Sequence, residues 1–554
     1  MPDYLQLIKD KNKEENLLIQ RMDADKDLLY LKKYVMQDKN LKAIPGIINV
    51  TLNDCAVFAA NVISAFGSTS QQTEVVSEDK DIDTKYIEDF QAACINAANA
   101  RLRNMGKPQL NLFTDEQLSI RGRSALRCLF RMENGKLIPD ITAWDTRYVK
   151  YQMGIDGMVW GSYQTRRANG KITNEYGPDI EKYRVGLSGN YTEVTDVWTT
   201  EGNIVYIGEK TVRERPHGYG YTPIVIQVVP LGSMLQDTDS IAHWGESIFF
   251  LIRDIIPELN RLASMAQTIN FAVVKGAKIY KSKAGVSAEP PEYEDATGLG
   301  AITAVDPEGG IENVPIQDIT RAFTQMHSIL ESRMQRGSLS SLDLGTLTFP
   351  LSAVALVEIG EGRDQVFLPR LNSKALLNQD LAAMFTKQIL DMGQDVKIGK
   401  RTFELKKLDG EYDTTYKYFS KSPKIDVARY SIATSAERYL SERGVLTDVI
   451  QHPDPEGVLR ERSWDLAAKI SPAIMRHRII KDLIEMEKDL EAEIMSAEMG
   501  MTLKQVLAGV PLEPPKEGGV PEPILPLMAG GGVGGAQTSA QKASQLQKEV
   551  RGIE

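Results

Sequence analysis

The stretch from Gly245 to Leu390 constrains the fold most, because two apolar-striped helical segments bracket a segment of strand-like and turn-like sequence. In the first of them, residues 246–271, apolar residues recur at intervals that alternate between four and three. This spacing is typical of a helix packed lengthwise against neighbouring helices, and also of an ordinary core helix. Pro257 lies inside the segment, so the helix either kinks there or begins with this proline in its first turn. The apolar seam consists of Ile248, Ile252, Ile255, Leu259, Leu262, Ala266 and Ile269.

The first half of the chain divides into a helical part and a β part. Residues 1 to about 130 are mostly helical in pattern, and residues 86–105 form an amphipathic helix that Gly106 ends. From residue 137 to 229 the sequence changes to short alternating runs separated by turn dipeptides such as Asn169–Gly170. We therefore expect an antiparallel β subdomain there.

The second half continues with alternating textures. We expect a strand-and-turn excursion at 274–317, an amphipathic helix at 318–336 and a Gly/Ser-rich loop at 338–350. A helical stretch follows at 351–390, with breaks at Gly360, Gly362 and Pro369, and then a β patch at 396–405. The chain continues with a helical region at 431–499, whose last helix starts at Ser471–Pro472, and a Pro/Gly-rich tail from Pro511.

Composition limits the class of protein. A chain of 554 residues can bury several cores, and its net charge of −10 argues against sequence-specific DNA binding, which needs a concentrated basic face. The three cysteines lie far apart and are expected to be buried and reduced. The most apolar run, 44–66, is interrupted by polar residues, so it predicts a buried helix rather than a membrane span. The N-terminus has no signal-peptide pattern, and we expect synthesis in the cytoplasm.

Motifs for chemistry are weak. Asp79, Asp81 and Asp83 imitate the start of a calcium loop, but the turn glycine and the final glutamate are missing. A G-x-G-x-x-G at 530–535 follows no strand, and there is no P-loop or H-E-x-x-H motif. We therefore expect a protein that is not an enzyme and that uses no metal and no cofactor.

Three stretches occur in a definite order: H-G-Y-G-Y-T-P-I-V (217–225), G-E-S-I-F-F-L-I-R-D-I-I-P-E-L-N-R-L (245–262) and L-S-A-V-A-L-V-E-I-G-E-G-R-D-Q-V-F-L-P-R-L (351–371). In order and spacing they resemble the turn before the stem, the first stem helix and the stretch after the tunnel loop of portal (head-to-tail connector) proteins of tailed double-stranded DNA bacteriophages. Gly360 and Gly362 depart from the family, in which this helix continues.

The resemblance implies an α+β fold, mainly α-helical, that assembles into a ring of twelve subunits around a central channel. It implies a wing at 1–243, a first stem helix at 244–273, a clip at 274–317, a second stem helix at 318–337, a tunnel loop at 338–350, a wing helix and β patch at 351–430, a helical crown at 431–510 and a flexible tail at 511–554.

Two sets of site residues follow from the resemblance. The candidates for the lining of a DNA channel are Arg333, Arg336, Ser338, Ser340, Ser341, Asp343, Thr346 and Thr348. The candidates for docking in the clip are Lys278, Lys281, Lys283, Glu292, Tyr293 and Glu294. Both sets are also typical of solvated helix ends and turns.

The implied partners are other copies of the chain (a dodecamer), the terminase large subunit, a tail adaptor or head-completion protein, the major capsid and scaffolding proteins, and double-stranded DNA that passes non-specifically. No membrane is implied, and the expected location is one capsid vertex of a virion. Twelve chains would total about −120, so the ring as a whole repels DNA rather than binding it. Two alternatives remain: a structural virion or scaffold protein without a DNA channel, and an enzyme with an unrecognised site.

Overall fold

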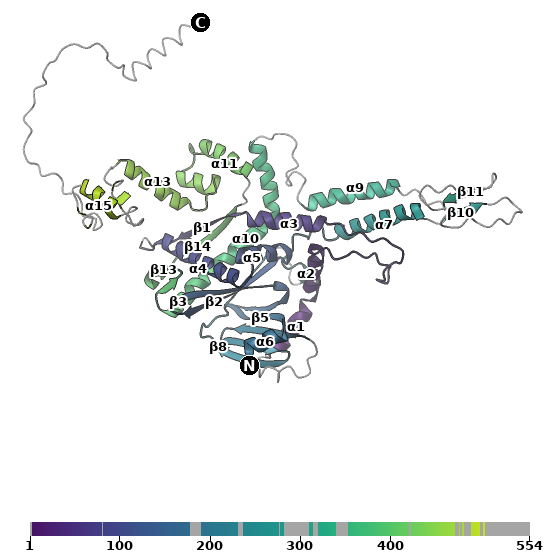
Figure 1. Cartoon of the computed structure of the whole chain (residues 1–554), viewed down its shortest axis with the longest axis horizontal. Helices are drawn as coiled ribbons and strands as arrows, with labels where there is room; N and C mark the ends of the chain where they lie inside the picture. Colours follow the sequence, from purple (N-terminus) through teal and green to yellow (C-terminus); the bar gives the residue numbers. More distant parts are fainter. Residues whose placement is uncertain are drawn as a thin grey trace, which may run out of the picture. The chain divides into compact units, whose positions relative to one another are not determined.

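In the computed structural model the chain forms two compact units, residues 1–459 and 460–554. Figure 1 shows the helices and strands coloured by their position in the sequence. The structure describes residues 3–79, 81–177, 190–230, 237–275, 278–281, 310–313, 320–338, 353–419, 423–470, 476, 479–480, 489–498, 502 and 504.

Helices dominate the N-terminal part of the first unit, as predicted. They are α1 (Tyr4–Glu14), α2 (Asn16–Leu29), α3 (Asp54–Gly67), α4 (Thr84–Asn104) and α5 (Leu110–Ile120). The carboxylate of Asp3 starts α1 by accepting hydrogen bonds from the N–H groups of Leu5 and Gln6. The helix expected from residue 44 begins only at Asp54, because the residues before it are extended.

The predicted antiparallel β subdomain is confirmed, although it begins at Arg123 rather than near residue 137. Its strands are β2 (Arg123–Glu133), β3 (Lys136–Trp144), β4 (Val149–Gly154), β5 (Gly157–Ala168), β6 (Tyr191–Thr199), β7 (Gly202–Ile207), β8 (Lys210–Pro216) and β9 (Ile224–Val228). They form a sheet of order β3-β2-β9 and a sheet of order β4-β5-β6-β7-β8. Asn169–Gly170, predicted as a turn, instead begins α6 (Asn169–Tyr176).

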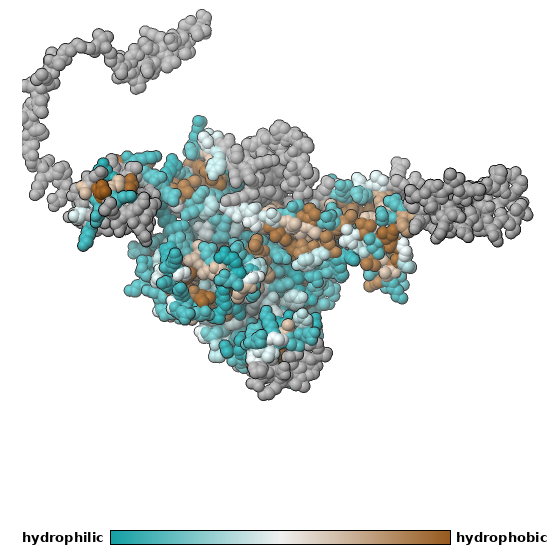
Figure 2. All heavy atoms as spheres, in the orientation of Figure 1, coloured by the Kyte–Doolittle hydropathy of each residue, from teal (hydrophilic) through white to brown (hydrophobic). Residues whose placement is uncertain are grey.

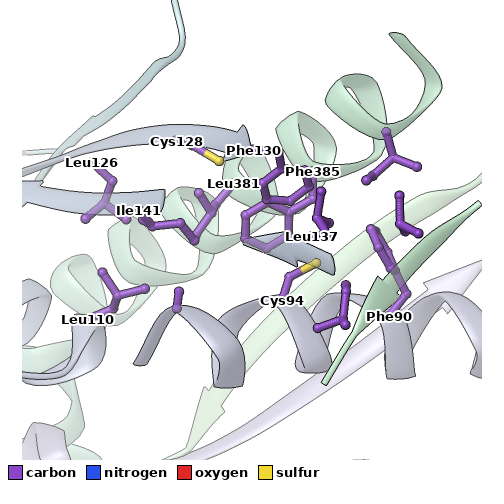
Figure 3. Close-up of a cluster of buried hydrophobic side chains, with 14 of the residues drawn as sticks. Phe90, Cys94, Leu110, Leu126, Cys128, Phe130, Leu137, Ile141, Leu381 and Phe385 are labelled. Atoms are coloured by element: carbon purple, nitrogen blue, oxygen red, sulfur yellow. The ribbon is translucent and has the colours of Figure 1, made fainter. Parts of the chain in front are cut away.

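The larger apolar core lies where β2 and β3 pack between α4 and α10 (Ala353–Met392), as Figure 3 shows. Phe130 of β2 stacks on Phe385 of α10 with ring centroids 5.4 Å apart. Cys94 and Cys128 are completely buried in this core, and both are free thiols, as predicted.

The helix α10 runs without a break, so the predicted interruptions at Gly360, Gly362 and Pro369 are wrong. A glycine costs a helix only about 1 kcal/mol and a proline about 3 kcal/mol. Burial of side chains such as Phe367 and Leu381 along the same helix outweighs these costs.

The remaining described elements include the predicted β patch. Outside the helix pair described below, the remaining α-helices and strands are β1 (Ser70–Val76), β12 (Val396–Ile398), β13 (Arg401–Phe403), β14 (Asp413–Phe419), α11 (Pro423–Ala436), α12 (Glu442–Gly444), α13 (Pro455–Ile470) and α15 (Asp489–Glu498). β1 pairs antiparallel with β14, a long-range pairing that the sequence does not predict. The predicted helix start at Ser471–Pro472 and the tail from Pro511 lie outside the described residues.

Among the residues that the structure describes, no helix combines the length and the apolar character that crossing a membrane requires.

Candidate functional site: a helix pair and the buried charges at its base

Two contacting helices, α7 (Ile255–Lys275) and α9 (Thr320–Gly337), bracket a short strand pair, as the sequence predicts. Figure 1 shows the two helices side by side. The strands are β10 (Lys278–Lys281) and β11 (Gly310–Asn313), which pair antiparallel.

The helix α7 begins at Ile255, not near Glu246, and this corrects the predicted seam. Proline has no N–H and clashes with the carbonyl one turn earlier, and Pro257 lies in the first turn of α7, where neither property disrupts a hydrogen bond inside the helix. Ile248 and Ile252 are buried, but in the turns that precede the helix.

The remaining seam residues are buried to different degrees. Leu259 is buried, whereas Ile255, Leu262, Ala266 and Ile269 are only partly buried. Ile256, which the seam omits, is buried in a second core together with Phe249 and α3. The inward face of α7 is therefore rotated from the predicted one at its start.

Large apolar side chains are exposed on the helix pair and just before it. Figure 2 shows hydrophobic surface gathered over this part of the molecule. Five of these side chains are between 40% and 60% exposed: Phe250, Leu251, Phe271, Met326 and Ile329. Exposed apolar side chains that gather on one part of a surface are typical of a site of association.

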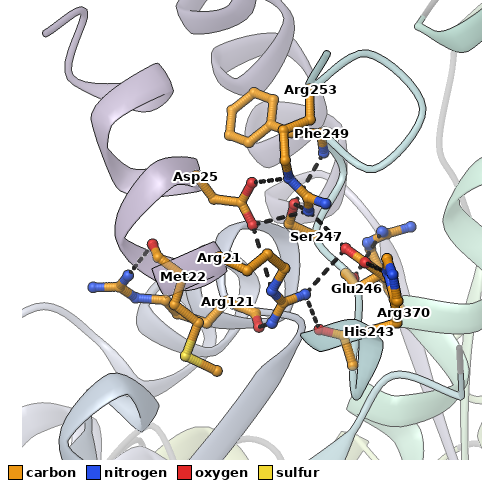
Figure 4. A network of polar contacts seen from close by, with 11 residues as sticks. Arg21, Met22, Asp25, Arg121, His243, Glu246, Ser247, Phe249, Arg253 and Arg370 are labelled. Atoms are coloured by element: carbon orange, nitrogen blue, oxygen red, sulfur yellow. Dashed lines mark hydrogen bonds and ion pairs between the residues drawn. The ribbon is translucent and has the colours of Figure 1, made fainter. Parts of the chain in front are cut away.

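A buried cluster of charges lies at the base of α7, shown in Figure 4. The guanidinium of Arg253 donates to both carboxylate oxygens of Asp25, at 2.8 and 3.2 Å, and to Oε2 of Glu246 at 2.6 Å. Arg21 of α2 donates to Oε2 of Glu246 at 3.1 Å and to the carbonyl of Gly245 at 2.6 Å. The cluster thus joins α2 to the segment that leads into α7.

A third cation reaches the cluster from α10. Nη2 of Arg370 donates to the backbone carbonyl of Glu246 at 3.1 Å. Burial lowers the pKa of Arg370 to about 10, and the nearby charge of Glu246 offsets part of that effect. Three segments that are distant in the sequence therefore meet at Glu246.

The pKa values of the central pair follow from these contacts. Burial alone would raise the pKa of Glu246, but the hydrogen bond from Arg253 and the charges of Arg21 and Arg253 outweigh it, so the pKa lies below its usual range. The pKa of Arg253 is raised, because its two carboxylate partners outweigh burial. Both groups are therefore charged at neutral pH.

Two glycines allow the backbone at this base to pass close to the sheet. Gly122 and Gly245 both have left-handed φ, +69° and +76°. A Cβ on Gly122 would lie 1.9 Å from the carbonyl oxygen of Gly245, and a Cβ on Gly245 would lie 2.6 Å from that of Gly122. Only glycine fits at these two positions.

The predicted channel residues are only partly described. Arg333 and Arg336 are exposed on α9, and Ser338 is partly buried after its end. A Cβ on Gly337 would lie 2.8 Å from Cγ2 of Ile252, so this end of α9 lies against the base of α7. The other channel candidates, Ser340, Ser341, Asp343, Thr346 and Thr348, lie outside the described residues.

The predicted docking residues are described only in part. Lys278 and Lys281 are the first and last residues of β10. The candidates outside the described residues are Lys283, Glu292, Tyr293 and Glu294.

The charge cluster itself was not predicted. The stretch 245–262 contains Glu246 and Arg253, and Arg21 and Asp25 have the i, i+4 spacing of a helical pair. Nothing in the sequence indicates that these two pairs meet, because about 225 residues separate them.

No protein-family model matches the chain, and no curated protein matches it. Among solved structures, it is similar to a chain from the neck of an empty GTA particle, computed with C6 symmetry, at 12% sequence identity and a TM-score of 0.39. The match covers 71% of this chain and 88% of that chain.

Proposed function

We propose that the chain is the portal protein of a tailed bacteriophage or a phage-like particle. In this role, copies of the chain form a ring at one capsid vertex. Double-stranded DNA passes through its central channel during packaging and ejection. The role is structural rather than enzymatic.

The observation that supports this proposal most is the exposed apolar surface on the α7–α9 pair. Met326 and Ile329 are exposed on α9, while Leu330 of the same helix is buried and Met334 packs against the second core. A folded chain that leaves such residues uncovered on a rigid helix pair is suited to association with further copies. Head-to-tail contacts of identical subunits form a ring when the rotation between neighbours closes.

The distribution of charge also favours a channel. The helices α7 and α9 contain five basic and two acidic residues, although the whole chain has a net charge of −10. A sparse excess of positive charge on the helices, within an acidic particle, allows loose contact with phosphates without tight binding. Arg333 and Arg336 are the described residues that we assign to this contact.

In the proposed assembly, the segment 274–317 docks the terminase large subunit during packaging and a tail adaptor afterwards. Capsid and scaffolding proteins surround the ring, and twelve copies form it. A structural virion component without a channel is the alternative.

A charge placed on the exposed apolar face tests the proposal. We expect Ile329→Glu to shift the purified chain from a ring-sized oligomer to smaller species, measured by native mass spectrometry or mass photometry. Gln325→Glu is the matched control, because it adds the same charge at another exposed position of α9. An unchanged mass of both variants, or a monomeric wild-type chain at micromolar concentration, would contradict association through this face.

A further inference from the structure

Residues 31–52, which connect α2 to α3, form an extended hairpin that lies on α7, and we name this segment the strap. Near its tip, Gln37 bridges to Ala43, and the N–H of Ile44 donates to the carbonyl of Met36 at 3.0 Å. The strap is neither helix nor part of a described sheet.

Three alternate N–H groups of the strap donate to three side chains of α7. The N–H of Ile48 donates to Oγ1 of Thr268 at 3.0 Å. The N–H of Val50 donates to Oγ of Ser264 at 2.8 Å, and the N–H of Leu52 donates to Oδ1 of Asn260 at 2.8 Å. The residue numbers of the donors increase along the strap while those of the acceptors on α7 decrease, so the two segments run antiparallel.

The geometry of the two segments matches. Two residues of extended chain advance about 6.6–6.8 Å, and four residues of α-helix advance about 6.0 Å. Every second residue of the strap therefore lies opposite every fourth residue of α7, and the three successive hydrogen bonds stay in register.

The acceptors on α7 are held in place by the helix itself. The hydroxyl of Ser264 donates to the carbonyl of Asn260, and the hydroxyl of Thr268 donates to that of Ser264, both at 2.7 Å. Each hydroxyl hydrogen is thus used inside the helix, which leaves oxygen lone pairs for the strap.

The register is defined by what flanks these three residues. At the same spacing, the next positions on α7 are Ile256 and Ala272, which have no side-chain acceptor. A slip of the strap by one turn in either direction leaves one of the three N–H groups opposite an apolar residue.

Side-chain acceptors also hold the outer arm of the strap, which contains Tyr34 and Met36, to the inner arm, which lies on α7. The N–H of Tyr34 donates to Oγ1 of Thr51 at 2.9 Å, and the N–H of Met36 donates to Oδ1 of Asn49 at 2.8 Å. The outer arm of the strap is therefore attached to side chains of the inner arm.

Left-handed backbone conformations occur at one end of the strap and at its tip. Leu31, which follows α2, and Leu41, at the tip, have left-handed φ of +52° and +61°. This conformation is strained for a residue other than glycine. The side chain of Leu41 is also 78% exposed.

We propose that the strap is a latch on α7, which holds the helix in one register and opens as a unit while the cores beneath α2 and α3 stay folded. Its attachment consists of side-chain acceptors and not of a backbone ladder, and its two ends are held by the charge cluster at Arg21 and by the second core at Cys55. The proposal does not depend on ring formation.

Hydrogen exchange of the full-length chain tests the latch. In the wild type, peptides that cover residues 46–53 should exchange slowly. In Ser264→Ala/Thr268→Val we expect them to exchange at least tenfold faster, while peptides from α4 and β2 keep their wild-type rates. Thr268→Ser is the matched control, because it keeps the hydroxyl and should keep slow exchange.

The single variant Thr268→Val, which is nearly isosteric, serves if the double variant does not fold. Two results would overturn the proposal. One is unchanged exchange of residues 46–53 in both valine variants. The other is equal acceleration of the strap and the α4–β2 core, which would mean that the strap does not open separately.

Discussion

The helix α10 passes through two regions that are built in opposite ways. Its C-terminal half packs Leu377, Leu381 and Phe385 into the apolar core with α4 and β2. Near its middle, Arg370 enters the charged base of the α7–α9 pair. The core depends on shape and apolar area, whereas the base depends on the balance between buried carboxylates and the buried or partly buried cations around them. The two regions should therefore respond differently to truncation, to backbone changes and to pH.

Removal of the central cation should give the largest effect. Arg253→Met removes the cation that donates hydrogen bonds to both Asp25 and Glu246 and leaves Arg21 as the guanidinium that faces both carboxylates, and we expect a loss of about 5 kcal/mol in the free energy of unfolding. Denaturant titration measures this loss. Arg261→Met, at a half-exposed position of α7, is the control and should cost less than about 1 kcal/mol. Equal effects of the two substitutions would show that the base is not a distinct charged region.

Truncation in the apolar core should have a slightly smaller effect. Phe385→Ala removes a fully buried ring that stacks on Phe130, and we expect a loss of about 4 kcal/mol in the free energy of unfolding. Leu376→Ala on the exposed side of the same helix should be nearly neutral. A loss that varies with pH between 4 and 7 would contradict a purely apolar core.

Alanine substitutions at Gly245 and Gly218 distinguish the cost of a left-handed φ from the cost of a steric clash. Gly245→Ala brings a Cβ to 2.6 Å from the carbonyl of Gly122, whereas a Cβ on Gly218 meets nothing within 4 Å, and both residues have φ above +70°. We expect a loss of about 3 kcal/mol for Gly245→Ala and about 1 kcal/mol for Gly218→Ala in thermal unfolding. Similar losses would mean that the base tolerates a wider separation from the sheet.

The smallest expected difference between the charge cluster and the apolar core lies in how stability depends on pH. Because the pKa of Glu246 is below its usual value of 4.5 in the folded chain, its contribution to stability is present above that value. The contribution is lost as the pH falls through the lower folded value. We therefore expect the stability of Glu246→Gln to fall less than that of the wild type between pH 5 and pH 3. Parallel curves for the two proteins would contradict the charged role of Glu246.

Regular patterns predicted much of the fold. Alternation and turn dipeptides predicted the antiparallel strands, and the apolar stripe predicted α4 and its end near Gly106. The start of α7 was one of two alternatives that Pro257 left open, and only packing against Phe249 and α3 decides between them. The breaks that we predicted in α10 at Gly360, Gly362 and Pro369 were wrong, because the prediction gave local helix propensity more weight than burial.

The candidate site was predictable only in outline. The order of helix, strand pair and helix follows from the sequence, and so does the seam at Leu259. The charge cluster and the strap depend on contacts between residues more than 200 positions apart, such as Val50 with Ser264. A single sequence contains the polar residues at the right spacing, but not the information that they meet.

Electron microscopy of the purified full-length chain, with particles viewed along their symmetry axis, tests the proposed ring most directly. The account predicts closed rings of about twelve subunits with a central hole wide enough for double-stranded DNA. Particles without a central opening, or a uniform population of monomers at micromolar concentration with and without capsid and scaffolding proteins, would contradict it.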